Sequence, residues 1–175
     1  MTIPIAYWML SGAVAAHRAQ EIVATLSQYC DRILTVPTPN SARVISPREL
    51  ARIPGHRLVE SYFDQALTPR APLAPVLWMP CSFNSLNKLA HGIADNLALS
   101  IVAEMIGARQ TVTVACALNS QLWAHPAVQS SVDTLRSWGV RVVEPVTDAA
   151  GLTMAHTKDV LATFLGATGV PYKPR

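Results

Sequence analysis

The sequence predicts an α/β fold, in which a parallel β-sheet carries helices on both of its faces within a single domain. Apolar runs that suit buried strands alternate along the chain with amphipathic helical stretches, and this order is typical of parallel sheets covered on both faces. The length of 175 residues suits one domain with one sizeable core. We therefore expect residues 1–175 to form one α/β unit.

The periodicity of apolar residues places the individual elements. Strands are predicted at residues 3–10, 32–37, 74–79, 110–115 and 140–143, and helices at 14–29, 80–97, 97–107, 127–138 and 159–165. A further helix is predicted to start at Ser46, which would be its N-cap. Pro47 would take the first helical position and Glu49 would complete a capping box. Prolines make residues 54–75 irregular. Residues 145–157 are expected to form a loop and residues 168–175 a flexible tail.

Composition and charge exclude several classes of protein. Half of the residues are hydrophobic and only 14% are charged, which predicts extra buried surface, most simply a subunit interface. The net charge of +3 comes from scattered basic residues, so no nucleic-acid partner is expected. The first twenty residues lack a basic start, and their apolar part is too short to span a bilayer, so we expect neither a signal peptide nor a membrane partner.

The cysteines argue against a metal site or a disulfide framework. Cys30, Cys81 and Cys116 are odd in number, lie far apart and include no CxxC pair. Reduced thiols in the cytoplasm fit this pattern best, and no metal is expected.

Polar or small loops follow four of the predicted strands, at residues 11–13, 38–44, 81–85 and 116–119. Since the carboxyl ends of parallel strands meet at one edge of a sheet, and ligands lie beyond that edge, these loops predict a single site. The third loop opens a helix, whose free N–H groups and dipole favour an anion or a cofactor. An ordinary strand–loop–helix connection is the alternative interpretation of that loop alone.

Residues 80–97 read PCSFNSLNKLAHGIADNL and resemble the family of homo-oligomeric FMN-containing cysteine decarboxylases. Members of that family carry a P-A-S-A-N-T loop followed by K-(I/L)-A-x-G-I-x-D-N-L-L. Three other segments are also similar to family motifs: residues 9–18 to G-x-T-G-S-I-A-A-x-K, 38–45 to T-P-x-A-x-x-F-(I/V), and 116–126 to P-A-M-N-x-x-M-W-x-x-P. The resemblance spans roughly residues 3–145.

The resemblance implies a Rossmann-like, flavodoxin-type fold, a closed homo-oligomer built from trimers (a trimer or a dodecamer), and FMN as cofactor. Ala13 replaces a serine that is expected to help hold the flavin phosphate, and Ser11 is the nearest other hydroxyl. The residues implied to bind the cofactor are Ser11, Gly12, Thr38, Asn40, Ser41, Val44, Ser82, Phe83, Asn84, Ser85 and Ala117.

The same resemblance implies the substrate-binding and catalytic residues. Asn119 would hold the substrate carboxylate, with Leu122 and Trp123 beside it, and Asn84 would lie between flavin and substrate. An amide can hold a carboxylate and an adjacent peptide group because it offers both a donor and an acceptor. A turn role for Asn119 and core packing for Trp123 are the structural alternatives.

The family's active-site histidine has no counterpart here. Its place falls near residues 65–67, which contain no histidine. His56 precedes this place and is interpreted as a surface-loop residue, whereas Asp64 is the candidate substitute base. In the family, the segment equivalent to 145–157 can close over the substrate as a clamp, and the histidine within it, His156, is expected to be exposed to solvent.

The family reaction removes the carboxylate of a cysteine. The thiol-bearing carbon is first oxidised to a thioaldehyde, which accepts the electrons released with CO2, and an enethiol results. Phosphopantothenoylcysteine decarboxylases then reduce the enethiol with a cysteine in an A-C-G segment after the last strand. Residues 149–154 contain no cysteine, so the chain resembles the peptidyl-cysteine decarboxylases of lantibiotic-type maturation. The partner of those enzymes is a precursor peptide with a C-terminal cysteine, and their product leads to aminovinyl-cysteine.

Three alternatives stay open at this point. The chain could be a phosphopantothenoylcysteine decarboxylase of coenzyme A biosynthesis, a flavin-binding protein without decarboxylase activity, or a flavin prenyltransferase of related fold. The G-I-A-D-N-L and N-S-Q-L-W segments favour the decarboxylases over the prenyltransferase.

Overall fold

The computed structural model describes residues 2–173 and contains the predicted parallel sheet. The strands lie in the order β3-β2-β1-β4-β5-β6, and all of their pairings are parallel. Their bounds are β1 Ala6–Leu10, β2 Ile33–Pro37, β3 Arg57–Leu58, β4 Val76–Cys81, β5 Val112–Cys116 and β6 Arg141–Val143. Without the short edge strand β3, the order is that of a flavodoxin-type sheet, whose direction of winding changes between β1 and β4.

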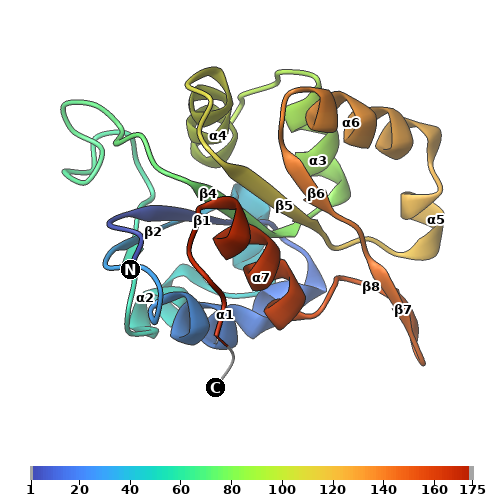
Figure 1. The fold of residues 1–175 in the computed structure, drawn as a ribbon, viewed down its shortest axis with the longest axis horizontal. Coiled ribbons are helices and arrows are strands. Elements are labelled where there is room, and N and C mark those ends of the chain that lie inside the picture. Colours follow the sequence, from blue (N-terminus) through green and yellow to red (C-terminus); the bar gives the residue numbers. More distant parts are fainter. Residues whose placement is uncertain (1, 174–175) are drawn as a thin grey trace.

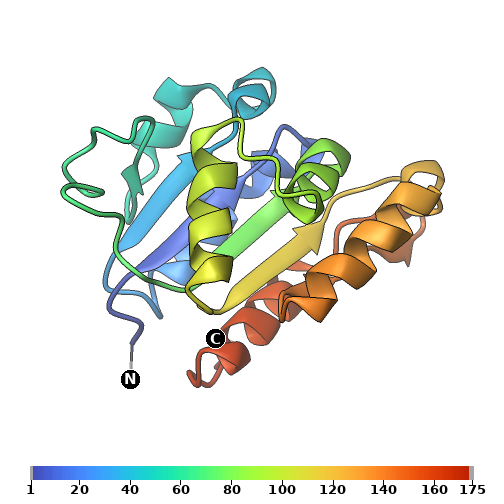
Figure 2. The same cartoon turned by 90° about the horizontal axis from the view of Figure 1, so that it is seen from above.

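Helices cover both faces of the sheet, as predicted (Figure 1). One face carries α3 Phe83–Ala90, α4 Leu97–Gly107 and α6 Pro126–Ser137, and the other carries α1 Ala19–Leu26, α2 Pro47–Arg52 and α7 Thr157–Ala167. Side chains alternate between the faces along each strand. Tyr7 and Met9 of β1 are buried in the first core, and Trp8 and Leu10 in the second. The arrowheads in Figure 2 point to one end of the sheet, so the loops after the strands share an edge.

The predicted helix at residues 80–97 is two helices. Helix α3 ends at Ala90, and Gly92 then takes a positive φ of 67°, a conformation that a helix cannot contain. Asn96 caps α4, since its side chain accepts a hydrogen bond from the N–H of Leu99 at 3.2 Å. Ile93 lies between the two helices and is 46% exposed, instead of on a buried stripe.

Three short elements were not predicted as such. The predicted helix at residues 14–29 begins as a 3-10 helix, η1 Val14–Arg18, and a second 3-10 helix, η2 Pro39–Arg43, follows β2. A four-residue helix, α5 Ser120–Trp123, follows β5. By contrast, the predicted capping box of α2 is confirmed, because Ser46 and Glu49 exchange hydrogen bonds of 3.0 and 3.2 Å.

Residues 145–157 form more than a loop. They contain an antiparallel hairpin of β7 Val146–Asp148 and β8 Gly151–Thr153, paired in register. This hairpin extends beyond β6 at the carboxyl edge (Figure 1).

The segment predicted to be a flexible tail, residues 168–175, makes contacts with α1 as far as Lys173. The Tyr29 hydroxyl donates to the Lys173 carbonyl oxygen at 2.7 Å and accepts from the Lys173 N–H at 3.1 Å. The Tyr29 and Tyr172 rings lie 5.8 Å apart, and Val170 is buried. These contacts anchor the segment to the end of α1, while residues 174 and 175 lie outside the described residues.

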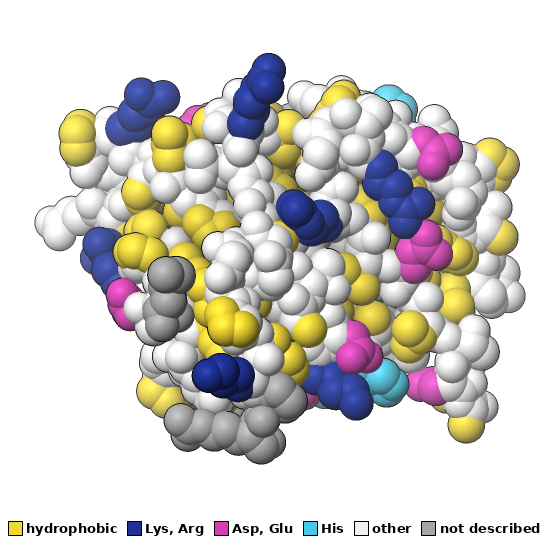
Figure 3. Space-filling view, viewed as in Figure 1, with side chains coloured by type: hydrophobic (Ala, Val, Ile, Leu, Met, Phe, Trp, Pro, Cys, Tyr) yellow, Lys and Arg dark blue, Asp and Glu magenta, His cyan; other side chains and the backbone are white. Residues whose placement is uncertain are grey.

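The outer surface shows no gathering of one charge on the face seen in Figure 3. Lys and Arg are scattered over it with Asp and Glu between them. Within residues 2–173, no helix combines the length and apolar character needed to cross a membrane.

Candidate active site

Loops from several elements surround one cavity at the carboxyl edge of the sheet. The cavity has a volume of about 590 Å³ and brings together the loop after β1, the start of α3, the segment after β5 and the strand β8. Its lining residues are Gly12, Ala13, Val14, Ala15, Asn40, Ser82, Phe83, Asn84, Ala117, Leu118, Asn119, Leu122, Leu152, Thr153 and Met154. The predicted convergence of loops is confirmed for Gly12, Asn40, Asn84 and Asn119. None of these lining side chains is charged.

A smaller cavity of about 160 Å³ lies on the other side of Asn84. It shares Asn40 and Ser82 with the main cavity and adds the predicted residues Thr38 and Ser85, together with Lys88 and Asp95. Lys88 and Asp95 form an ion pair, and the hydrogen bond from Lys88 holds the pKa of the Asp95 carboxyl below its usual range.

Gly12 is required by the close approach of two of these loops. A Cβ added at Gly12 would lie 2.3 Å from the carbonyl oxygen of Asn40. Any side chain would therefore push the loop after β1 away from η2. The glycine keeps the two loops in contact where they line the cavity.

The start of α3 presents free hydrogen-bond donors to both cavities. Ser82 is the N-cap, and its hydroxyl accepts from the N–H of Ser85 at 3.4 Å. The N–H groups of Phe83 and Asn84, the first two residues of the helix, have no hydrogen-bond partner among residues 2–173. Free N–H groups at a helix N-terminus favour an anionic or electron-rich group.

Buried hydroxyls link this helix start to the sheet. The hydroxyl of Ser11 contacts that of Ser85 at 2.9 Å and accepts from the Trp78 indole N–H at 2.9 Å. Ser85 in turn contacts the Ser82 hydroxyl at 3.2 Å. Ser11 is fully buried and lines neither cavity, so neither cavity brings its hydroxyl to a ligand, and its role in place of the missing phosphate contact at Ala13 stays a prediction. Ser11 follows Tyr7 and Met9 at a spacing of two residues, so its side chain lies on the same face of the sheet as theirs.

Asn119 combines a structural contact with a free donor. Its side-chain oxygen caps α5 by accepting from the N–H of Leu122 at 2.9 Å. Its amide nitrogen has no partner among the described residues, so it remains available to a ligand in the cavity. Leu122 also lines the cavity, whereas Trp123 packs against the core, which favours the structural alternative for the tryptophan.

Four other predicted positions lie outside the main cavity. Thr38 and Ser41 are buried, and the Ser41 hydroxyl donates to the Thr38 carbonyl at 2.7 Å. Val44 is 38% exposed and lines neither of the two cavities. The Asp64 carboxylate accepts from Arg57 at 2.7 Å and from the N–H of Ala66 at 2.7 Å. Asp64 lines neither cavity, so within one chain the structure does not place it beside Asn119.

His56 lies in the loop before β3, as interpreted, but its side chain is not free at the surface. Its ring is half-buried, packs edge-on against Trp8 and contacts the Thr35 hydroxyl at 2.6 Å and the Leu50 carbonyl at 3.0 Å. The carbonyl can only accept, so Nε2 carries the proton and the neutral ring is fully bonded. Burial lowers the pKa of His56 against the opposite effect of the Leu50 bond. His156 is exposed, as expected.

Two cysteines lie under the site without reaching it. Cys81 and Cys116 are register partners at the ends of β4 and β5, and both are buried. Burial raises the pKa of Cys81 well above its ordinary value and that of Cys116 to about 12. Both are therefore neutral thiols and poor nucleophiles.

The comparisons with known proteins place this architecture in a family. The family model described as Flavoprotein matches residues 4–169. The chain belongs to the flavoprotein family. This membership confirms the predicted fold and, at the level of the family, the predicted flavin cofactor.

Individual relatives of this flavoprotein include solved cysteine decarboxylases. The FMN-dependent cysteine decarboxylase SpaF is 26% identical with a TM-score of 0.77, over 94% of this chain and 97% of SpaF. The peptidyl-cysteine decarboxylase EpiD shares the fold, with 22% identity and a TM-score of 0.79, over 94% of this chain and 99% of EpiD.

Among curated proteins, the bifunctional coenzyme A biosynthesis protein CoaBC of Mycobacterium tuberculosis is 30% identical over 143 residues, which cover 79% of this flavoprotein and 34% of CoaBC. A putative phosphopantothenoylcysteine decarboxylase of Dictyostelium discoideum is 25% identical over 151 residues, which cover 78% of this chain and 76% of the relative. The chain thus spans about a third of the length of the bifunctional relative.

The residues at the carboxyl edge fit a flavin. The free N–H groups of Phe83 and Asn84 lie at the start of α3, and the amides of Asn40 and Asn84 line both of the adjacent cavities. Leu152, Thr153 and Met154 bring the hairpin to the cavity wall and were not predicted individually as site residues. The prediction of a substrate clamp at 145–157 was the signal that pointed to them.

Proposed function

We propose that this flavoprotein carries out the FMN-dependent oxidative decarboxylation of a peptide's C-terminal cysteine to an aminoenethiol. The observation that carries the proposal is the main cavity, which is largely apolar, contains no charged side chain and has the free Asn119 amide at its wall. Such a cavity suits a peptide end whose only charge is its terminal carboxylate, which the Asn119 amide can hold. The family and the decarboxylases SpaF and EpiD support the reaction class.

The residues of this chain would bind and orient the substrate. The Asn119 amide N–H donates to the terminal carboxylate, and Leu122 and Met154 exclude water around the thiol-bearing carbon. Bound FMN supplies the two-electron oxidation of that carbon, and Asn84 lies where cofactor and substrate would meet. The substrate loses CO2 and two hydrogens, which leave with two electrons, so its carbon–carbon bond becomes a double bond beside the thiol.

No dedicated base is assigned in this scheme. A cysteine thiol has a pKa of roughly 8.5, so a few per cent is thiolate near neutral pH. The N–H groups at the start of α3 favour that thiolate further. General-base help is worth about 10²–10⁴-fold, so its absence makes a slow enzyme instead of an inactive one.

The second candidate is phosphopantothenoylcysteine decarboxylase, favoured by the 30% identity to CoaBC. Two features of this chain argue against it. Its substrate carries a phosphate, and the main cavity offers no cation to pair with one. The hairpin turn at residues 149–151 holds no cysteine, and the three thiols of the chain are buried elsewhere.

Mass spectrometry separates these functions. The FMN-loaded protein is incubated with a peptide ending in an apolar residue and cysteine, with the same peptide carrying a C-terminal amide, and with phosphopantothenoylcysteine. We expect a loss of about 46 mass units, CO2 plus two hydrogens, from the first peptide and none from the amide. A loss of about 44 units from phosphopantothenoylcysteine alone would support the second candidate. If FMN stays bound and no substrate changes, the protein is a flavin-binding protein without decarboxylase activity.

We also propose a closed homo-oligomer, a trimer or a dodecamer, in the cytoplasm. The apolar composition supports the assembly, and the three buried reduced thiols support a reducing compartment. The precursor peptide is the proposed partner.

A further inference from the structure

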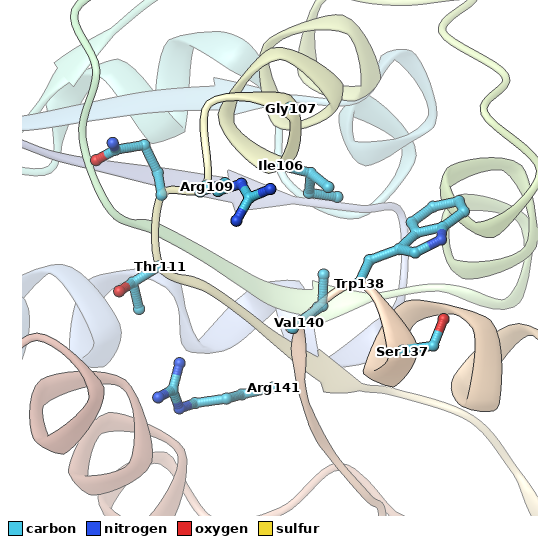
Figure 4. A pocket seen from close by; sticks show the side chains of 10 residues that line it. Ile106, Gly107, Arg109, Thr111, Ser137, Trp138, Val140 and Arg141 are labelled. Carbon is cyan, nitrogen blue, oxygen red and sulfur yellow. The ribbon is translucent and has the colours of Figure 1, made fainter.

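A second large cavity lies at the opposite edge of the sheet, where the strands begin. It has a volume of about 590 Å³, within the range of small-molecule sites. The turns from α4 into β5 and from α6 into β6 form its walls, and Figure 4 shows the side chains that line it. No residue of the candidate active site contributes to it.

Arg109 occupies a backbone position in this cavity that ordinarily selects glycine. Its φ is 57°, and every other described residue with a positive φ is a glycine. The equivalent turns after α3, α6 and α7 use Gly92, Gly139 and Gly169. A left-handed conformation is unfavourable for a residue with a Cβ, and such residues gather at functional positions. An arginine thus occupies this turn against the backbone preference.

Two unpaired guanidinium groups face the cavity. Among residues 2–173, neither Arg109 nor Arg141 has a side-chain hydrogen bond or ion pair, whereas Arg57 and Arg136 are paired with carboxylates. Two free arginines on one cavity favour an anion that offers oxygen atoms to both, such as a phosphate.

An aromatic surface adjoins these charges. Trp138 is 46% exposed and lies with Ile106 on one side of Arg109, whereas Arg141 lies on the other side, next to Thr111 (Figure 4). A ligand that fills the cavity therefore needs a flat ring at one end and negative charge at the other. An exposed indole binds the face of a nucleobase by stacking.

We propose that this cavity binds a nucleoside monophosphate, with the base against Trp138 and the phosphate on Arg109 and Arg141. The proposal does not depend on the decarboxylase function, because the two cavities share no residue. Figure 4 shows the arginines and the tryptophan around one space, as this mode of binding requires.

Calorimetric titration of the FMN-loaded protein tests the ligand class. The probes are AMP, adenosine, which lacks the phosphate, and inorganic phosphate, which lacks the base. We expect AMP to bind at least about tenfold more tightly than either fragment, since only AMP engages both ends of the cavity. Absence of AMP binding overturns the proposal, and so does phosphate binding as tightly as AMP, which would indicate a simple anion site.

Variants identify the cavity as the binding site. Arg109→Gly removes the guanidinium and suits the positive φ, so it should weaken AMP binding by about tenfold without lowering the melting temperature. Arg141→Gln should weaken AMP binding similarly, whereas Arg48→Gln, an equal loss of charge on α2, should leave it unchanged. If AMP binds Arg109→Gly and Arg141→Gln as it binds the wild type, AMP binds elsewhere on the FMN-loaded protein and the proposal fails.

Discussion

At the scale of single residues, a substitution at Asn119 can test substrate binding without removing the cap of α5, because the oxygen caps the helix and the amide nitrogen is free. Aspartate caps helices as well as asparagine does, so Asn119→Asp should keep α5 intact while replacing the free amide donor by a carboxylate that repels the substrate's own. We expect kcat/KM for a cysteine-terminated peptide to fall by about 10²-fold or more, with unchanged thermal stability. Steady-state kinetics and a melting curve on FMN-loaded protein measure both effects.

Asp64→Asn is the matched control for this substitution. The Asp64 carboxylate is paired with Arg57 away from the cavity, so the change should alter kcat/KM by less than about threefold. Loss of turnover in Asp64→Asn with flavin still bound would show that Asp64 is the substitute base and that our scheme without a dedicated base is wrong.

The buried thiols predict how stability depends on alkaline pH. Burial raises the pKa of Cys30 and of Cys116 from 9.0 to about 12. Between these values the folded chain keeps thiol protons that the unfolded chain has lost, so the free energy of unfolding is undiminished below pH 9 and falls as the pH rises toward 12. The slope is up to about 1.4 kcal/mol per pH unit for each thiol.

Urea denaturation at pH 8 and at pH 10, with reductant, measures this slope. Cys116→Ser removes one raised pKa, so its stability should decline less between the two pH values than that of the wild type. Equal declines in both proteins would contradict the assignment of Cys116 as a buried thiol.

The sequence was sufficient to place a residue at the carboxyl edge when that placement followed from its position after a strand. Gly12, Asn84 and Asn119 follow strands, and parallel strands must end together. Ser11 could not be placed by that rule, because its role depends on which face the side chain takes and on its partner Trp78. The contacts of His56 to Thr35 and Leu50 could not be predicted for the same reason, since they are tertiary.

At the scale of elements, the N-cap of α3 couples the fold to the cofactor. Ser82→Ala removes the cap hydroxyl and its contact to Ser85, which should lower stability by about 1 kcal/mol. The same change should weaken FMN binding, because the first turn of α3 lines both cavities. Thermal melting and fluorescence titration with FMN measure the two effects.

Ser46→Ala is the control for this cap. Ser46 makes the same kind of N-cap in α2 but lines neither cavity, so it should cost similar stability and leave FMN affinity unchanged. Equal FMN affinities in the two variants would show that the α3 cap has no part in cofactor binding.

Strands were predicted more accurately than helices and connections, for a physical reason. Strands β1, β4 and β5 are buried on both faces, and a continuous apolar run identifies such a strand. The break between α3 and α4 depends on the single residues Gly92 and Asn96, which a helical apolar pattern obscures. The hairpin of β7 and β8 is three residues per strand, too short for an alternation to be recognised.

At the scale of the whole molecule, the sequence order of strands and helices was sufficient to predict the sheet and both helical layers. The match of the flavoprotein family to residues 4–169 agrees with that architecture. The substrate is not decided at this scale, because relatives with this fold include both peptidyl-cysteine and phosphopantothenoylcysteine decarboxylases. The choice depends on side chains in one cavity and one hairpin.

The last prediction concerns assembly. Phe63 is 93% exposed in the loop after β3, with Tyr62 and Leu73 also exposed, which is unfavourable for a monomer and suits a subunit contact. We expect light scattering to show a trimer-based oligomer and Phe63→Lys to shift it toward monomer. We further propose that assembly completes the cofactor site, so the monomeric variant should lose FMN on desalting. Gln20→Lys adds the same charge at an exposed polar position on α1 and should change neither property. A stable wild-type monomer that retains its full complement of FMN would refute the assembly and its link to the cofactor.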